Sequence, residues 1–176
     1  MILHLNGRPG SGKLTIGRVL AERLGGRLLD CHSIYNVAFA LTDFGSDLCR
    51  QTVAEVRAVA FARILDLPQA VPVVLTDALF DDSSRGQAAW DAVLDLARKR
   101  GGPYLVVALD CEKAENERRL RGPERMGKRK PMDGTVLRPD RYTRVPITRG
   151  ADRVLHLDVT RLSPEAAAAR IADWAG

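Results

Sequence analysis

A glycine-rich turn near the start of the chain constrains its fold more than any other feature. The apolar run 2–5 leads directly into segment 7–15, Gly-Arg-Pro-Gly-Ser-Gly-Lys-Leu-Thr, which has the spacing G-x-x-x-x-G-K. Glycines adopt backbone conformations that a Cβ would forbid, so successive N–H groups can converge on a phosphate while Lys13 supplies positive charge. A helical pattern follows and ends at Gly25 and Gly26. The sequence therefore predicts a phosphate-binding loop, with contacts from Gly7, Pro9, Gly10, Ser11, Gly12, Lys13, Leu14 and Thr15.

Short apolar runs alternate with helical patterns along the rest of the chain. Further strands are expected at 26–30, 71–75, 104–109 and 153–157, each ending in or followed closely by an aspartate, which gives Asp30, Asp77, Asp110 and Asp158. Helices are expected between them, with Ser33, Asp47 and Ser163 as N-caps. This alternation predicts an α/β doubly wound sheet of about five parallel strands with helices on both faces, in a single domain spanning 1–176. Ligands of such sheets bind beyond the carboxyl ends of the strands, where these aspartates lie.

Positive charge is concentrated in one segment. Eleven Lys or Arg face three acids between Arg118 and Arg149, whereas the whole chain carries +5, so the remainder is net negative. Helical and strand periodicity fail from Gly122 to Gly150, and a segment of that length without a pattern is typical of a lid. We therefore expect a basic lid at about 118–150 that acts on a polyphosphate ligand.

Other features of the sequence limit where the protein is expected in the cell and which cysteine sites it can contain. No run of about 18 apolar residues occurs, and the short apolar run at 2–5 does not form a leader. The three cysteines, Cys31, Cys49 and Cys111, match neither a disulfide framework nor a known metal spacing. We expect a cytoplasmic protein that does not bind membranes and has buried thiols, and the sequence leaves its oligomeric state open.

These motifs resemble those of the small P-loop kinases of the shikimate kinase, gluconate kinase and chloramphenicol phosphotransferase group, in the P-loop NTPase superfamily. The resemblance rests on G-x-x-G-x-G-K-x-T, on Asp30 ending a short second strand, on the arginines after the fourth strand, and on Arg161 and Pro164 after the last strand. It covers nearly the whole chain. It implies a three-layer P-loop NTPase sandwich with a basic lid, and an ATP-dependent, Mg²⁺-dependent kinase that acts on an alcohol group.

The resemblance also implies roles for individual residues. Lys13 would bridge the β- and γ-phosphates, Asp30 would accept a proton from the acceptor, and Arg121 and Arg125 of the lid, with Lys128, would stabilise charge on the γ-phosphate. Arg118 or Arg119, with Arg161 and Pro164, would lie against adenine. The Ser or Thr expected after the lysine is replaced by Leu14, which is similar to the adenylate kinase variant. Mg²⁺ would then be held by Asp77 and through water, with Thr15 as the other candidate ligand.

The acceptor is less constrained than the donor. The glycine run that shikimate kinases carry after the third strand is absent, so shikimate is rejected. Asp30, His32, Tyr35 and Phe80 are the predicted acceptor-binding residues, and His32 stands where relatives with a D-x-D arrangement have a second acid. Asp81 and Asp82 would add an acidic rim that suits a cationic or polyhydroxyl acceptor. By contrast, His4 and His156 lie inside predicted strands and are expected in the core.

Two other classes of function remain open. The first is a kinase acting on nucleic acid or nucleotides, or a toxin-like P-loop enzyme, because the basic segment could track a phosphate backbone. Only Tyr142 supplies an aromatic ring there, which disfavours nucleic acid because single-strand binding uses interleaved aromatic platforms. The second is a non-catalytic ATP-binding switch, and the absence of an N-K-x-D sequence argues against a guanine-specific one. We expect a nucleotide and a small hydroxylated acceptor as the partners.

Overall fold

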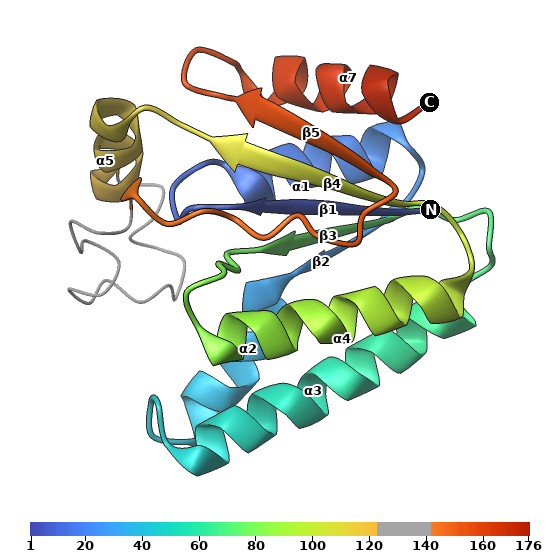
Figure 1. The fold of residues 1–176 in the computed structure, drawn as a ribbon, viewed down its shortest axis with the longest axis vertical. Coiled ribbons are helices and arrows are strands. Elements are labelled where there is room, and N and C mark those ends of the chain that lie inside the picture. Colours follow the sequence, from blue (N-terminus) through green and yellow to red (C-terminus); the bar gives the residue numbers. More distant parts are fainter. Residues whose placement is uncertain (123–141) are drawn as a thin grey trace.

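The computed structural model describes residues 1–122 and 142–176. In this part of the chain one sheet of five parallel strands has the order β2-β3-β1-β4-β5 (Figure 1). The strands are β1 (Ile2–Gly7), β2 (Arg27–Asp30), β3 (Val73–Asp77), β4 (Tyr104–Asp110) and β5 (Arg153–Asp158). The helices are α1 (Lys13–Arg23), α2 (Cys31–Leu41), α3 (Asp47–Asp66), α4 (Ser84–Arg100), α5 (Lys113–Arg121) and α7 (Pro164–Ala175). The predicted fold class is confirmed.

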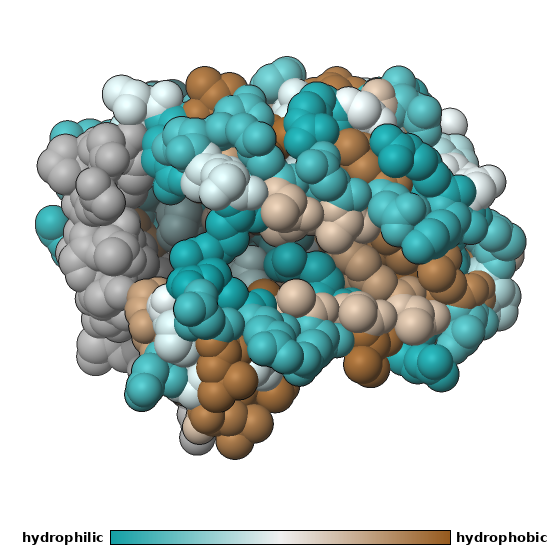
Figure 2. Space-filling model, turned by 60° about the horizontal axis from the view of Figure 1, so that its bottom comes forward, coloured by the Kyte–Doolittle hydropathy of each residue, from teal (hydrophilic) through white to brown (hydrophobic). Residues whose placement is uncertain are grey.

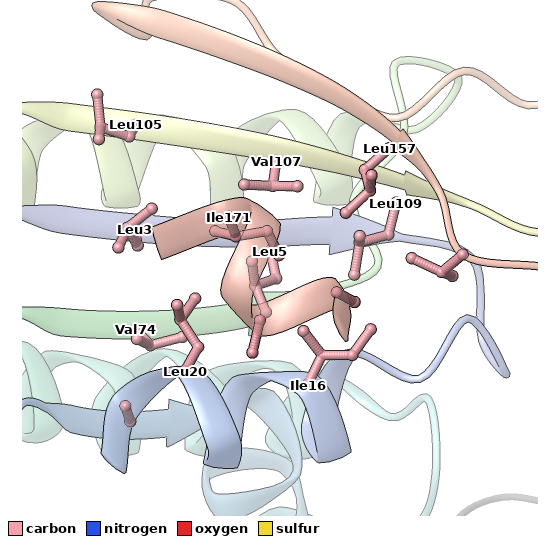
Figure 3. Packing of buried hydrophobic residues seen from close by; sticks show 14 of the residues in the cluster. Leu3, Leu5, Ile16, Leu20, Val74, Leu105, Val107, Leu109, Leu157 and Ile171 are labelled. Atoms are coloured by element: carbon pink, nitrogen blue, oxygen red, sulfur yellow. The ribbon is translucent and has the colours of Figure 1, made fainter. Parts of the chain in front are cut away.

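Helices cover the sheet on both faces. Helices α1 and α7 pack together on one face, whereas α3 and α4 lie on the other (Figure 1). Because side chains alternate along a strand, Leu3 and Leu5 of β1 point to the first face, where they meet Leu20 and Ile171 (Figure 3). Ile2 belongs to the core of the opposite face, together with fully buried Trp90 of α4. Both faces of the central strands are therefore apolar, as buried parallel sheets require.

The helix starts differ from the predicted caps by a few residues. The Asp30 carboxylate accepts the backbone N–H of His32 at 3.2 Å, so α2 begins at Cys31 instead of following Ser33. Ser46 likewise caps α3 in place of Asp47. Ser163 does cap α7 as predicted. Ser and Asp are both good caps, and the backbone conformation of each residue decides which of them accepts the bond.

The two histidines expected in the core have different environments. His4 is completely buried between Trp90 and Tyr104. His156 is exposed, so its prediction was wrong. His156 lies on β5, at the edge of the sheet. It is on the face opposite to that of Leu157, which packs against α7, and this face of the edge strand is exposed.

A buried arginine closes the end of the sheet opposite to the phosphate loop. Arg100, at the end of α4, is 2% exposed, and its guanidinium donates to the carbonyls of Ile64 at 2.5 Å, Pro68 at 3.0 Å and Val71 at 2.7 Å. These carbonyls belong to the end of α3 and the turn into β3, where those of Ile64 and Pro68 also accept backbone N–H groups, so Arg100 ties the helix end to the turn. Within the described residues, no helix combines the length and the apolarity that crossing a bilayer demands.

Candidate functional site

The phosphate loop has the strained geometry that its glycines permit. Gly10 and Gly12 have φ values of 85° and 88°, which L-residues with a Cβ rarely adopt. The ammonium of Lys13 donates to the carbonyls of Gly7 and Arg8, both at 2.8 Å. Ser11 is fully buried, and its Oγ has no hydrogen-bond partner among the described residues. A buried hydroxyl without a described partner, beside the N-terminus of α1 and a lysine, fits the binding of a phosphate chain.

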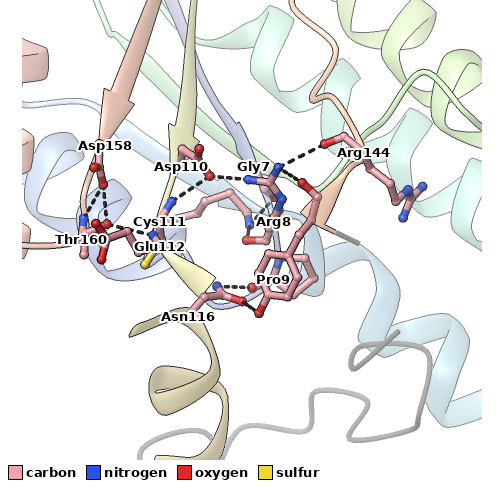
Figure 4. Close-up of polar contacts among 12 residues, drawn as sticks. Gly7, Arg8, Pro9, Asp110, Cys111, Glu112, Asn116, Arg144, Asp158 and Thr160 are labelled. Carbon is pink, nitrogen blue, oxygen red and sulfur yellow. Dashed lines mark hydrogen bonds and ion pairs between the residues drawn. The ribbon is translucent and has the colours of Figure 1, made fainter. Parts of the chain in front are cut away.

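Two side chains that the sequence analysis did not single out hold this loop in place. Arg8 pairs with Asp110 and donates to the Tyr142 carbonyl at 2.8 Å. Asn116 of α5 donates to the Pro9 carbonyl at 2.9 Å and accepts the Tyr142 hydroxyl at 3.1 Å (Figure 4). The loop is therefore fixed by β4, by α5 and by the segment that follows residue 141.

Asn6, the residue before the loop, ties three segments together. Its amide nitrogen donates to the carbonyls of Leu79 at 2.8 Å and Ile147 at 3.0 Å, and its oxygen accepts the Leu79 N–H at 2.9 Å. All three residues are buried. The end of β1, the exit from β3 and the segment before β5 are thus joined by one side chain, which sequence patterns alone did not reveal.

Asp77 lies at the end of β3, next to the loop strand. Its Oδ2 lies 3.1 Å from His4 Nε2, while His4 Nδ1 lies 2.9 Å from the Tyr104 hydroxyl. Burial is the main reason why the pKa of Tyr104 is raised, and the charge of Asp77 adds to it. Asp77 Oδ1 is buried and has no hydrogen-bond partner among the described residues. A carboxylate oxygen in that state fits a hydrated Mg²⁺, whereas Thr15 is exposed at the start of α1.

Asp30, at the end of β2, is 9% exposed. Its Oδ1 accepts the Thr76 hydroxyl at 2.5 Å, and its Oδ2 accepts the His32 backbone N–H. Two hydrogen bonds therefore fix the carboxylate in one orientation. Because β3 separates β2 from β1, Asp30 lies two strands away from the phosphate loop.

A cavity of about 1050 Å³ joins the phosphate loop to Asp30 and continues between α3 and α4. Figure 2 shows the face made by these two helices, which is hollowed and has both polar and apolar residues at its rim. Aromatic rings follow one another along its wall, from His32 to Tyr35, from Tyr35 to Phe39 and from Phe39 to Phe44, with centroids 5.4 to 6.2 Å apart. The structure thus brings Lys13, Asp30, His32 and Tyr35 to one cavity.

The charge of this cavity differs from the expected acidic rim. Its described lining includes six cations and two acids: Lys13, Arg50, Arg57, Arg85, Lys99 and Arg119, against Asp30 and Asp95. Arg57 donates to the Tyr35 hydroxyl at 3.3 Å. Burial raises the pKa of Tyr35, which keeps this hydroxyl neutral. The lining therefore suits an acceptor with a negatively charged group.

Asp82 of the expected acidic rim and Phe80, which was predicted to bind the acceptor, both lie away from the cavity. Asp82 is paired with Arg144 through two hydrogen bonds of 2.5 and 2.6 Å, which lower its pKa. Phe80 is 4% exposed and packs under the same guanidinium, 4.2 Å from its ring centroid. Neither residue is among the described residues that line the cavity. The Asn6 contacts to Leu79 and Ile147 bring residues 80 and 146 together, which directs Phe80 away from the cavity.

Two of the residues predicted on the adenine side, Arg118 and Arg119, belong to α5. Arg119 lines the cavity and donates to the carbonyls of Val159 and Thr160 at 2.9 and 3.2 Å, next to Arg161 in the loop after β5. Arg118 instead is exposed and makes two hydrogen bonds to Glu115. The two arginines lower the pKa of Glu115 to about 2. Of the two alternatives Arg118 and Arg119, only Arg119 contacts the loop after β5.

The remaining predicted residues have fewer described contacts. Arg121 is exposed at the end of α5, and Pro164 is the first residue of α7. Arg125 and Lys128 lie outside the described residues, as does most of the predicted lid. Asp158 accepts the hydroxyl and the amide of Thr160 (Figure 4), and these bonds lower its pKa. Asp110 and Asp158 therefore hold the loops around the site.

Parts of this chain are similar in sequence to cytidylate kinases. That of Afipia carboxidovorans is 45% identical over 87 residues, which are 48% of this chain and 39% of the relative. That of Azotobacter vinelandii is 33% identical over 108 residues, which are 56% of this chain and 47% of the relative. The matched part thus spans less than half of the length of these curated relatives. No family model matches the chain.

Solved structures resemble this chain over nearly its whole length. A candidate kinase from Chloroflexus aurantiacus has a TM-score of 0.70 at 16% identity, covering 99% of this chain and 94% of the other. The tunicamycin resistance protein of Deinococcus radiodurans has a TM-score of 0.64 at 21% identity, with 99% and 95% covered. The gluconokinase of Sinorhizobium meliloti has a TM-score of 0.59 at 19% identity, with 98% and 94% covered, and shikimate kinases match as well. The fold of this chain is therefore that of the P-loop kinases, as its motifs implied.

Proposed function

We propose that this chain, acting as one domain over 1–176, transfers the γ-phosphoryl group of ATP to a hydroxyl of a small molecule. One observation carries the proposal: the phosphate-loop lysine, Lys13, and the buried carboxylate of Asp30 line the same cavity. The cationic lining favours an acceptor that also carries a carboxylate or a phosphate. The P-loop kinase fold of the structural neighbours supports the same reaction class.

Each part of the site would have a separate role in this reaction. The amides of the loop and Lys13 would hold the phosphates of ATP, with Arg119, Arg161 and Pro164 on the adenine side and Arg118 as the other predicted contact. Mg²⁺ would be held by Asp77, whose buried Oδ1 lacks a described partner, with Thr15 as the second candidate ligand. When bound, the ion would neutralise charge on the phosphates. Arg121 and Arg125 would supply positive charge that stabilises the transferring γ-phosphoryl group.

Asp30 would take the proton of the acceptor hydroxyl. Its two hydrogen bonds, from Thr76 and from the His32 amide, hold the carboxylate toward the cavity, and His32 and Tyr35 would contact the acceptor there. General base catalysis contributes about 10²–10⁴-fold to such transfers. Asp30→Asn should therefore lower kcat by about that factor while ATP still binds.

The test measures ADP release with ATP, Mg²⁺ and a panel of hydroxylated acids and phosphates. Lys13→Ala should abolish transfer without unfolding the protein. Asp95→Asn is the matched control, because Asp95 lines the same cavity but is exposed and paired with Lys99 at 2.7 Å. Full activity of Lys13→Ala on the best acceptor, or of Asp30→Asn on a hydroxyl acceptor, would refute the proposal.

A second candidate is transfer to the phosphate of a nucleoside monophosphate. Arg50, Arg57 and Arg85 in the cavity lining favour it, as does the name cytidylate kinase carried by the partial sequence relatives. A phosphate acceptor is already ionised and needs no base, so Asp30→Asn would then keep its kcat. Phosphorus NMR of a reaction with CMP and ATP separates the two candidates, because only the second yields a nucleoside diphosphate from CMP.

A further inference from the structure

Three side chains with metal-binding atoms lie together at the start of α2. Asp30, Cys31 and His32 each offer one such atom, and these atoms all lie within 4.8 Å of one another. Cys31 Sγ lies 3.4 Å from His32 Nδ1, which in turn lies 3.4 Å from Asp30 Oδ2. No other group of three His, Cys, Asp or Glu side chains in residues 1–122 and 142–176 has this property.

The two separations from His32 Nδ1 match edges of a zinc coordination tetrahedron. Zinc binds sulfur at about 2.3 Å, imidazole nitrogen at about 2.0–2.1 Å and carboxylate oxygen at about 2.0–2.2 Å. At the tetrahedral angle these bond lengths place sulfur and nitrogen about 3.6 Å apart and nitrogen and oxygen about 3.4 Å apart. Both observed distances, from His32 Nδ1 to its two neighbours, are within about 0.2 Å of these values.

A neighbouring hydroxyl orients one member of the cluster, and the charges of the ligands suit a divalent ion. The Thr76 hydroxyl donates to Asp30 Oδ1 at 2.5 Å and orients the carboxylate, as hydrogen bonds to the ligands do in metal sites. Cys31 is the first residue of α2 and is 7% exposed, and binding of a metal ion would deprotonate its thiol. The carboxylate and the thiolate together neutralise a divalent cation, so the bound site would carry no net charge.

The cluster is also accessible from the cavity. All three residues line it, and 25% of the His32 side chain is exposed. Three protein ligands leave the fourth position of a tetrahedral ion facing this space. A thiolate and an imidazole select a zinc-type ion over Mg²⁺, which takes oxygen ligands.

We propose that Asp30, Cys31 and His32 form a binding site for Zn²⁺, separate from the Mg²⁺ expected beside Asp77. Binding releases the Cys31 proton, so affinity rises with pH. A bound Zn²⁺ would coordinate the carboxylate of Asp30, which could then no longer accept a proton. Zn²⁺ therefore inhibits phosphoryl transfer to a hydroxyl, a consequence that rests on the proposed function, whereas the binding itself does not.

The test uses Co²⁺ alone as a spectroscopic substitute for Zn²⁺, with no nucleotide present. Titration of the wild-type chain should produce a thiolate-to-cobalt absorption band, and Cys31→Ser should abolish it. Cys49→Ser is the matched control, because Cys49 is also buried near a helix start and lines the same cavity, yet lies outside the cluster. Absence of the band in the wild type, its survival in Cys31→Ser, or its loss in Cys49→Ser alone would overturn the proposal.

Two further variants separate ligation from structure. His32→Ala should weaken Zn²⁺ binding, measured by calorimetry, at least about tenfold, and Thr76→Val should weaken it by about 10–100-fold through the orientation of Asp30. Zn²⁺ should also raise the melting temperature of the wild type more than that of His32→Ala. Unchanged Zn²⁺ affinity in a His32→Ala protein with a wild-type circular dichroism spectrum would contradict the site. Zn²⁺ binding without any kinase activity would leave the site standing and refute only the proposed function.

Discussion

Replacing Asn6 with alanine should destabilise the protein by several kcal/mol, because one amide satisfies three buried backbone groups. The Leu79 carbonyl would keep a partner, since the Ile147 N–H donates to it at 3.1 Å. The Leu79 N–H and the Ile147 carbonyl would lose the Asn6 bonds of 2.9 and 3.0 Å in a region that is 6% exposed at Leu79 and 1% exposed at Ile147. Each buried group left unpaired costs about 1–3 kcal/mol, so the expected loss for the two groups is about 2–6 kcal/mol.

Urea denaturation followed by circular dichroism measures this loss. With a slope of about 2 kcal/mol per M, the midpoint should fall by about 1–3 M while the slope stays unchanged. Asn36→Ala is the matched control, because Asn36 is exposed on α2 and its change should stay within about 0.5 kcal/mol. Asn6→Asp should be worse than Asn6→Ala, since it sets a carboxylate oxygen against two carbonyls. A midpoint shift below about 0.3 M for Asn6→Ala would show that the Asn6 hydrogen bonds contribute little to the stability of the fold.

Three further perturbations follow from contacts described above. Gly10→Ala places a Cβ 2.8 Å from Asn116 Nδ2 and 2.9 Å from Leu120 Cγ at a φ of 85°, so nucleotide affinity by calorimetry should fall more than about tenfold. Gly45→Ala is the control, because Gly45 also has a positive φ, of 80°, but nothing lies within 4 Å of the new Cβ, so this change should cost only about 1 kcal/mol of backbone strain. Equal ATP affinity in the two variants would contradict the predicted effect of the Gly10→Ala clash. Arg100→Met should cost about 1–3 kcal/mol in urea, because the Val71 carbonyl loses its donor while the carbonyls of Ile64 and Pro68 keep backbone N–H partners, and a loss under about 0.5 kcal/mol would show that water replaces the guanidinium. Because the pKa of Glu115 is lowered from its usual 4.5 to about 2, its contribution to stability is full above pH 4.5 and disappears as the pH falls through 2. The stability difference between the wild type and Glu115→Gln should therefore shrink over that interval in urea titrations, and a difference independent of pH would count against the ion pairs.

The sheet and the phosphate loop could be predicted because their signals are local. Five apolar runs, each closed by a polar residue, correspond to β1 through β5, and the glycine spacing at 7–12 requires the positive φ values that Gly10 and Gly12 show. The start of α2 was misplaced because Asp30 and Ser33 are both competent caps. Local sequence decides between such alternatives only through the backbone conformation of the folded chain.

The long-range part of the site could not be predicted in this way. Asp30 and Lys13 share a cavity only because of the strand order, which composition does not encode. Phe80 looked like an acceptor-binding aromatic, but Asn6 binds a residue 73 positions later and turns the chain so that Phe80 meets Arg144. The cationic lining came from α3 and α4, where Arg57 and Arg85 carry no motif and are brought together by packing alone.

Helix α3 separates the requirements of stability from those of recognition. Only Cys49 and Ile64 of its twenty residues are buried, yet the helix forms one long wall of the cavity. Substitutions at its cavity-facing positions, such as Ala54, Ala58 and Ala62, therefore remove little from the core. If the cavity binds the acceptor as proposed, a set of α3 variants can be screened against new acceptors on one unchanged scaffold, which makes this helix the natural place to redesign specificity.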